Sequence, residues 1–155
     1  MSSKKLTPGQ ALLKVKQFCA WQERCHSEVA QKLYDFGLTT DEAAEAISKL
    51  IEENYLNEER FAIQYAGGKF RIKQWGRVKI SFELKRKGVS SYCIKKALHA
   101  IDETAYACCF EKLVQQKKDA LNGERNVFIK KRKLRDFLLA KGFEQALVNE
   151  AVNAV

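Results

Sequence analysis

A short pattern that occurs three times constrains the fold of this chain more than any other feature. In each copy, two apolar residues lie four positions apart, a glycine follows four positions later, and another apolar residue follows the glycine. The copies are Val29-Leu33-Gly37-Leu38, Ile80-Leu84-Gly88-Val89 and Leu134-Leu138-Gly142-Phe143. Residues i and i+4 share one helix face, and glycine favours the left-handed backbone position that ends a helix. Each copy therefore predicts the last turns of an amphipathic helix and its C-terminus.

The agreement among the copies continues beyond the glycines. Apolar residues recur six, ten and thirteen positions later, as Ala43, Ile47 and Leu50, as Ile94, Leu98 and Ile101, and as Val148, Val152 and Val155. The glycines are 51 and 54 residues apart (88 − 37 and 142 − 88), and self-similarity at a nearly constant spacing is typical of repeat proteins. We therefore predict an all-α fold of three tandem three-helix repeats, 6–56, 57–102 and 103–155, that form an elongated, curved, right-handed-solenoid-like stack.

Turn and capping residues divide each repeat into helices. The 155 residues include one proline and eight glycines, which favours helices joined by short connections. Thr39 with Glu42 fits a capping box, in which a hydroxyl and a carboxylate satisfy free N–H groups at a helix start. Asn57 can cap the helix that follows. We expect about nine helices and no strands, near 8–22, 26–36, 40–54, 58–75, 77–87, 91–101, 104–121, 127–141 and 144–155.

Several classes of function are disfavoured. No stretch approaches the roughly 18 consecutive apolar residues of a membrane helix, and residues 1–10 carry charge without the apolar segment of a secretory signal. We therefore expect a cytoplasmic protein without a membrane partner. Because G-x-S-x-G, H-E-x-x-H and glycine-rich phosphate loops are absent from the sequence, we predict no enzymatic activity, no catalytic residue and no cofactor.

The five cysteines show neither a disulfide framework nor a C-x-x-C spacing. Cys19, Cys25 and His26 form part of a metal-ligand pattern, but no second pair of ligands follows them. We therefore interpret the cysteines as small buried apolar residues in a reducing compartment, and we predict no metal site.

Charge is distributed unevenly along the chain, whose net charge is +9. Residues 23–60 hold ten acidic and four basic side chains, residues 69–96 hold ten basic and one acidic, and residues 112–141 hold ten basic and three acidic. A solvated lysine-rich face is one explanation. Contact with a polyanion or an acidic protein surface is the other, and we favour it because ten bases against one acid exceed what solubility needs.

The basic residues of the second and third repeats are therefore the candidate binding residues. Trp75 and Phe70 lie among them, and an aromatic ring can stack on a base or lie under a cation. Packing of Trp75 against the core is the alternative, which we favour. The predicted partner-binding or DNA-binding residues are Lys69, Arg71, Lys73, Arg77, Lys79, Lys85, Arg86, Lys87, Lys130, Lys131, Arg132, Lys133 and Arg135.

These residues also carry a likeness to a known family. The segment GRVKISFELKRKGV (76–89) resembles the central signature of the RecX family of bacterial regulatory proteins. His26-Ser27-Glu28 to Leu33, residues 55–62 (YLNEERFA) and Lys133-Leu134 to Gly142-Phe143 resemble its other blocks in the same order. The likeness covers nearly the whole chain. Family members often have proline where this chain has Arg77 and a Lys-Gly-Pro or Arg-Gly-Pro step where it has Gln74-Trp75-Gly76.

The resemblance implies a fold of three tandem three-helix units and a regulatory role. Members of the family bind the RecA recombinase, lie in the groove of its filament on DNA, and usually suppress its ATPase, strand-exchange and coprotease activities. Some also bind single- or double-stranded DNA directly. We therefore predict a monomeric RecA inhibitor that regulates recombination and the SOS response. The alternative is a sequence-independent DNA-binding protein that has no recombinase partner.

Overall fold

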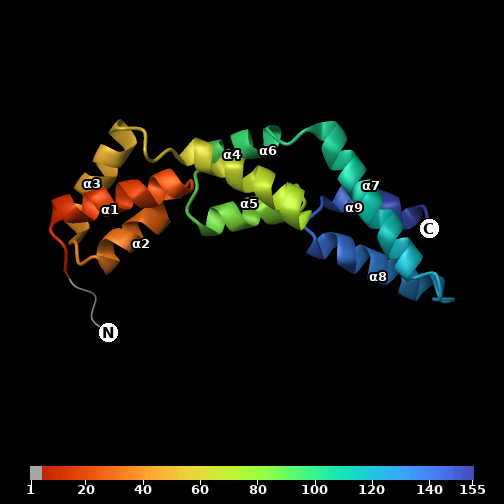
Figure 1. Ribbon diagram of the computed structural model, residues 1–155. Coiled ribbons are helices and arrows are strands. Elements are labelled where there is room, and N and C mark those ends of the chain that lie inside the picture. Colours follow the sequence, from red (N-terminus) through yellow and green to blue (C-terminus); the bar gives the residue numbers. More distant parts are fainter. Residues whose placement is uncertain (1–4) are drawn as a thin grey trace. The chain divides into compact units, whose positions relative to one another are not determined.

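The computed structural model describes residues 5–155, which fold as α-helices joined by short turns and contain no strand (Figure 1). The helices are α1 (Pro8–Trp21), α2 (His26–Asp35), α3 (Thr40–Glu52), α4 (Glu58–Gly68), α5 (Arg77–Arg86), α6 (Ser91–His99), α7 (Glu103–Ala120), α8 (Val127–Ala140) and α9 (Gln145–Asn153), with a π-helical segment η1 (Lys69–Lys73) after α4. The predicted all-α class of tandem three-helix repeats is confirmed. The predicted absence of a secretory signal concerns residues 1–10, of which the first four lie outside the described residues.

The three repeated glycines end α2, α5 and α8 in the same way. Gly37, Gly88 and Gly142 have φ angles of +91°, +81° and +91°. In each case the next residue donates its N–H to the carbonyl five positions before it, as Leu38 does to Leu33 at 3.1 Å. Each glycine N–H bonds the carbonyl three positions before it. This is the Schellman arrangement, in which the positive φ and the two hydrogen bonds satisfy the last carbonyls of a helix.

Local capping explains where two of the helices begin. The side chain of Thr39 accepts from the N–H of Glu42 at 3.2 Å, and the Glu42 carboxylate accepts from the N–H of Thr39 at 2.9 Å, so the predicted capping box is confirmed. The hydrogen bond from the Thr39 N–H lowers the pKa of Glu42 because it favours the ionised carboxylate. Asn57 accepts from the N–H of Arg60 at 2.9 Å at the start of α4.

The first helix of the second repeat differs from the sequence-based expectation of one helix to residue 75. Its α-helical part ends at Gly68, the five residues of η1 take the wider π-helical winding, and Gln74 then has a φ of +58°. A left-handed conformation at a residue other than glycine, asparagine or aspartate is uncommon and ends the helix sharply. The chain reverses here within two residues, and α5 begins at Arg77.

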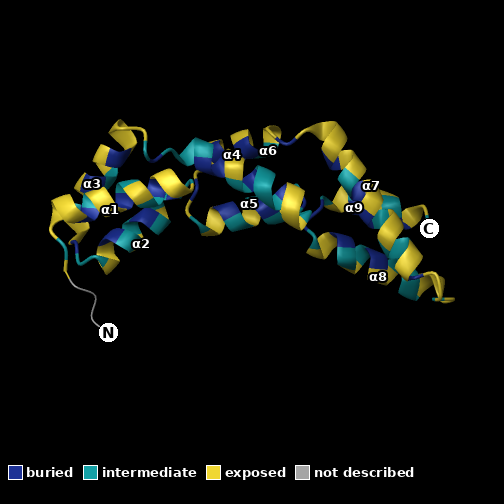
Figure 2. Ribbon diagram, viewed as in Figure 1, coloured by how far each residue is buried: buried dark blue, intermediate teal, exposed yellow. Residues whose placement is uncertain are grey.

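The chain divides into two compact units, each with its own buried residues (Figure 2). Unit 1 comprises residues 1–64 and 84–96, and unit 2 comprises residues 65–83 and 97–155. In unit 1, α1, α2 and α3 pack against one another around the core residues Ala11, Val15, Cys19, Val29, Leu33, Leu38, Ala43, Ala46, Leu50 and Leu56. The predicted boundaries of the three repeats, at residues 56 and 102, describe repetition in the sequence, whereas the two units describe compact packing. The repeat boundaries therefore stay a prediction.

The core of unit 2 contains a cluster of four aromatic rings. Phe143 lies 5.3 Å from Tyr106 and 5.1 Å from Phe110 between ring centroids, and Tyr106 lies 5.7 Å from Phe70. Such tilted ring pairs stabilise a core beyond the area that they bury. The rings come from η1, α7 and the residue after Gly142, and α8 packs against both α7 and α9. The aromatic cluster thus joins η1 to the third repeat.

Cysteine burial follows the sequence-based interpretation only in part. Cys19, Cys25 and Cys93 are buried, but Cys108 is exposed and Cys109 is half-buried. Burial raises the pKa of Cys19 to about 11, so this thiol stays protonated. Within residues 5–155, no group of three or more His, Cys, Asp or Glu side chains is placed to hold a metal ion. None of the described helices is both long and apolar enough to cross a bilayer.

Candidate partner-binding surface

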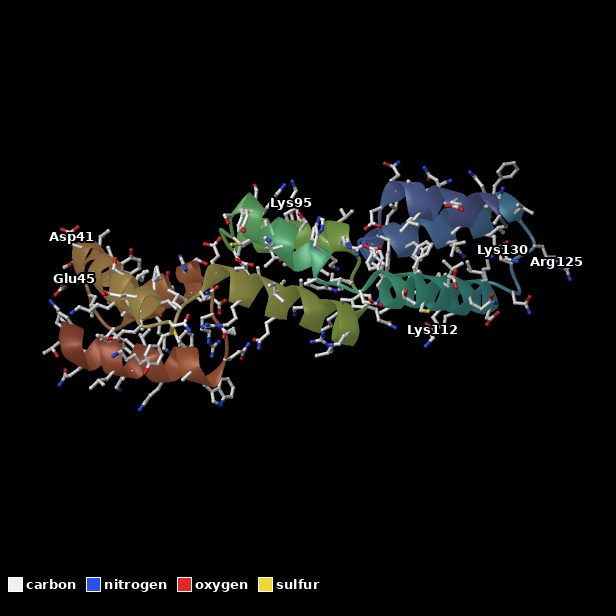
Figure 3. The ribbon with its side chains drawn as sticks, turned by 90° about the horizontal axis from the view of Figure 1, so that it is seen from above. Asp41, Glu45, Lys95, Lys112, Arg125 and Lys130 are labelled. Carbon is white, nitrogen blue, oxygen red and sulfur yellow. The ribbon has the colours of Figure 1, made fainter. Side chains whose placement is uncertain are left out.

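Positive charge is concentrated in unit 2. This unit contains 15 basic and 9 acidic residues, a balance of +6, whereas unit 1 contains 13 basic and 10 acidic residues, a balance of +3. Eight of the ten acidic residues of unit 1 lie between positions 23 and 53, within or beside α2 and α3. Asp41 and Glu45, one turn apart, both project from α3 into solvent (Figure 3). The field of unit 2 therefore favours an anionic partner more strongly than that of unit 1 does.

The segment η1 presents cations at close intervals. Arg71 and Lys73 are exposed and Lys69 is half-buried. The Arg71 guanidinium lies beside Gly67, where a Cβ atom would come within 2.8 Å of its Nη1. The Lys141 ammonium donates to the Lys73 carbonyl at 3.2 Å, which satisfies one carbonyl at the end of the segment. The π-helical winding and the missing Cβ at residue 67 together bring the Arg71 guanidinium against the helix.

Trp75 lies between η1 and α5 with two lysines over its ring. The ammonium of Lys79 is 4.7 Å from the ring centroid and that of Lys69 is 5.1 Å from it. The indole is half-buried and is not among the fully buried core residues, so packing of Trp75 against the core stays a prediction. A cation over an indole keeps its full charge while its position is restricted.

Arg77 has a different environment from the other candidate cations. Its guanidinium pairs with Glu103 at 2.8 Å, lies 4.0 Å from the centroid of the Tyr106 ring, and donates to the Leu98 and Ile101 carbonyls at 3.4 Å. These contacts hold α5 against the start of α7. Arg77 is thus occupied inside unit 2, and its side chain organises the surface rather than presenting a free charge.

The backbone of Arg77 takes part in the same network. Its N–H donates to the Tyr106 hydroxyl at 3.0 Å, and that hydroxyl donates to Glu144 at 2.5 Å. A proline at position 77 would lack this N–H, so the departure from the family signature at this residue makes the hydrogen bond possible. Burial and the hydrogen bond to Glu144 raise the pKa of Tyr106 well above its usual range, so this phenol is neutral and serves as a structural link.

We expect Tyr106→Phe to lower the free energy of unfolding by about 1–3 kcal/mol at pH 7, because the Arg77 N–H and the Glu144 carboxylate each lose a partner. The folded-state pKa of the phenol lies above its ordinary value of 10.0. The contribution of the phenol to the free energy of unfolding is therefore fully present below pH 10 and is lost as pH rises through the raised pKa. Urea denaturation should show that the free energies of unfolding of the wild type and of Tyr106→Phe differ at pH 7, and that this difference narrows above pH 10. A constant difference would contradict this assignment.

The other predicted cations of unit 2 lie on α8. Lys130, Lys131 and Arg135 are half-buried, and Arg132 and Lys133 are exposed; Lys130 lies near the turn that contains Arg125 (Figure 3). Lys133 has a weak ion pair with Glu124 at 4.0 Å. The helix dipole acts on charges in the first and last turns of a helix, and the last turn of α8 has no basic residue that it could favour. Local helix stability therefore does not explain this basic run.

The last three candidates, Lys85, Arg86 and Lys87, belong to unit 1. Lys85 and Arg86 occupy the last turn of α5, where cations are favourable towards the helix dipole. The Lys87 carbonyl accepts from the Ser27 hydroxyl at 2.9 Å. A structural role accounts for part of this basic run, so it is a weaker binding candidate than the run on α8.

Unit 2 also has a cavity whose lining is acidic rather than basic. It has a volume of about 580 Å³ and lies between α7 and α9, and its lining includes Phe110 and Leu147. Four carboxylates line it, those of Glu103, Glu111, Glu144 and Glu150, and only Arg77 among its lining residues is basic. Because Arg77, the one basic lining residue, is already paired with Glu103, the lining has a net negative charge, and the cavity repels anions and is unsuited to phosphate.

Comparison with known proteins gives these surfaces a context. The family description "RecX, second three-helix domain" matches residues 57–98. The "Regulatory protein RecX" of Pelodictyon phaeoclathratiforme is 32% identical over 131 residues, which cover 83% of this chain and 79% of that protein. The chain belongs to the RecX family. The RecX protein of Bacillus cytotoxicus is 28% identical over 140 residues, 90% of this chain, and the chain spans about half (51%) of its length.

The family fold is also present in a solved structure. The crystal structure of RecX from Lactobacillus salivarius superposes with a TM-score of 0.83, covers 95% of each chain and is 20% identical. The RecX family is regulatory, and the fold here places runs of basic residues on η1 and α8. The sequence did not signal that Arg77 is ion-paired, that Lys69 and Lys79 lie over Trp75, or that the acidic cavity exists, because each depends on how separate segments of the chain pack together.

Proposed function

We propose that this RecX family protein binds RecA filaments on DNA and inhibits the recombinase, ATPase and coprotease activities of RecA, and thereby regulates recombination and repair. The observation that carries the proposal is membership of the RecX family, together with a basic unit that is not explained by local stability. The proposed contact residues are the cations of η1 and α8 and Lys79, with Lys85, Arg86 and Lys87 as a secondary group. Arg77 positions α5 and α7.

The two units would serve different contacts. A RecA–DNA filament presents phosphates and protein charges of both signs. Cations that are restricted by neighbouring rings lose little freedom on binding an anion, and this favours Lys69 and Lys79 as phosphate or carboxylate contacts. The exposed acidic residues of α3 would face basic groups of the partner. Charge complementarity of this kind determines orientation and association rate more than it determines affinity.

The test is a titration of RecA ATPase on single-stranded DNA with the whole chain. Inhibition at concentrations far below those needed to coat the DNA supports a filament-directed mechanism. A sedimentation assay with RecA filaments, and with naked single-stranded DNA as control, should show preferential recovery with the filaments. Inhibition that appears only at coating concentrations would contradict the proposal.

A second candidate function is sequence-independent DNA binding without a recombinase partner. The environment of Trp75 favours it, because an aromatic ring flanked by ammonium groups is suited to a base and its phosphate. Binding of this kind should weaken steeply with salt and show little sequence preference. Equal recovery with filaments and with naked DNA would favour this second function over the first.

A further inference from the structure

Aromatic rings and cations alternate along one side of unit 1. The residues of this cation–ring row are, in spatial order, Lys14, Phe36, Lys32, Phe18, Arg24 and Trp21. The Lys32 ammonium lies 5.6 Å from the Phe36 ring and 5.3 Å from the Phe18 ring. The Arg24 guanidinium lies 3.8 Å from Phe18 and 5.8 Å from Trp21, and the Lys14 ammonium lies 5.9 Å from Phe36. The row joins α1 to α2.

The cations of the row keep their charge. An aromatic ring has a quadrupole but no net charge, so it restricts a cation without neutralising it. Within residues 5–155, neither Lys14 nor Lys32 is in an ion pair, and Arg24 has only a long one, to Glu28 at 3.9 Å. Arg24 also donates to the Phe18 carbonyl at 3.3 Å, which fixes its position. A positive strip therefore crosses the part of the chain that has most of the acidic residues.

Trp21 closes the row at the end of α1 and is 81% exposed. Tryptophan is highly buried on average in folded proteins, and no helix-capping role requires an indole here. Lys32 and Phe36 are spaced i, i+4 at the end of α2, so their contact is explained by helix stability. Helix stability does not explain why the exposed indole of Trp21 lies next to the restricted guanidinium of Arg24. An open π face beside a line of cations is the chemistry that binds unpaired bases and their phosphates.

We propose that the cation–ring row is a binding site for single-stranded nucleic acid. Trp21 stacks on one base, and Arg24, Lys32 and Lys14 contact the phosphates of the same strand. A duplex would not use the site in this way, because its bases are already stacked and paired. The site is separate from the cations of η1 and α8, and it needs no recombinase. It goes beyond the proposed function and does not depend on it.

The two tryptophans of the chain, Trp21 and Trp75, allow each site to be observed separately. In the Trp75→Phe variant the only indole is Trp21, and in Trp21→Phe the only indole is Trp75. Titration of Trp75→Phe with an oligothymidylate at low salt should quench the Trp21 emission, and added salt should restore it. A DNA hairpin duplex of equal length and inorganic polyphosphate should leave the emission nearly unchanged.

Two further variants test the roles within the row. Trp21→Ala should weaken oligothymidylate binding to unit 1 about tenfold, the effect of losing one stacked base, measured with Trp75→Phe as the reference and a 5′-fluorescent oligothymidylate as probe. Lys14→Gln with Lys32→Gln should reduce the salt slope by roughly 0.7 for each phosphate that a lysine no longer neutralises. Circular dichroism should confirm that these surface substitutions leave the helices unchanged.

The proposal is overturned by either of two results. In the first, Trp21 emission does not respond to the oligothymidylate, whether or not Trp75 emission does. In the second, duplex or polyphosphate quenches Trp21 as strongly as the oligothymidylate does, which would indicate a site for phosphate alone. Neither result concerns inhibition of RecA ATPase, so failure of this inference and failure of the proposed function are distinguishable.

Discussion

Replacement of Gly142 by alanine should destabilise the protein by about 2–5 kcal/mol, the largest effect that we expect from a single methyl group. Two costs add at this position. The φ angle of +91° is strained for any residue with a Cβ atom, by about 1–2 kcal/mol. The new Cβ atom would also lie 2.1 Å from the Cβ atom and 2.7 Å from the backbone nitrogen of Lys79, and overpacking against backbone costs about 1–3 kcal/mol.

Substitutions at Gly88 and Gly76 allow the cost of the positive φ angle and the cost of steric overlap to be measured separately. Gly88 has a φ angle of +81° but no atom within 4 Å of an added Cβ, so Gly88→Ala should cost only about 1–2 kcal/mol. At Gly76 an added Cβ would meet the Gly142 carbonyl oxygen at 2.4 Å without a positive φ, so Gly76→Ala should cost about 1–3 kcal/mol. Urea denaturation followed by circular dichroism should order the variants with Gly142→Ala least stable. Equal losses for Gly142→Ala and Gly88→Ala would contradict the close approach of Gly142 to α5.

Reversal of charge on α8 should weaken binding to RecA filaments at least tenfold. The variant is Lys131→Glu with Arg132→Glu, two cations that are in no ion pair within residues 5–155. If both contact anions in the complex, loss of two charged contacts removes several kcal/mol of binding free energy, and each 1.4 kcal/mol corresponds to about tenfold. Neither Lys131 nor Arg132 belongs to the buried core, so the fold should remain intact.

Lys95→Glu with Lys96→Glu is the matched control, because it reverses two adjacent exposed lysines on α6. It produces the same change in net charge and should alter filament binding by about twofold or less. Reversal of Lys85, Arg86 and Lys87 should give an intermediate loss. Binding should be measured by fluorescence anisotropy on RecA-coated single-stranded DNA, with circular dichroism to verify folding. Equal losses for the α8 variant and the α6 control would indicate a general charge effect and remove α8 from the proposed surface.

The candidate surface was predictable from the sequence only as a set of cations. The basic runs at 69–79 and 130–135 are visible as composition, and their exposure follows from helical periodicity. The sequence could not separate Arg77 from its neighbours, because its partners Glu103 and Tyr106 are 26 and 29 residues away. The cation–ring row was missed for the same reason, since it lies in the acidic third and depends on how α1 packs against α2.

The sequence by itself determined the helices and most of their ends, but not the π-helical segment and the left-handed Gln74 that follow α4. Apolar spacing, capping side chains and the glycines at 37, 88 and 142 act through hydrogen bonds between residues at most five positions apart, so a linear pattern contains all the information that they need. The tertiary structure decided which charges are free, which rings lie under cations, and why Gly76 and Gly142 must both lack a side chain. These properties depend on contacts between segments up to 68 residues apart (141 − 73), because burial and charge pairing are set by neighbours in space rather than in the chain.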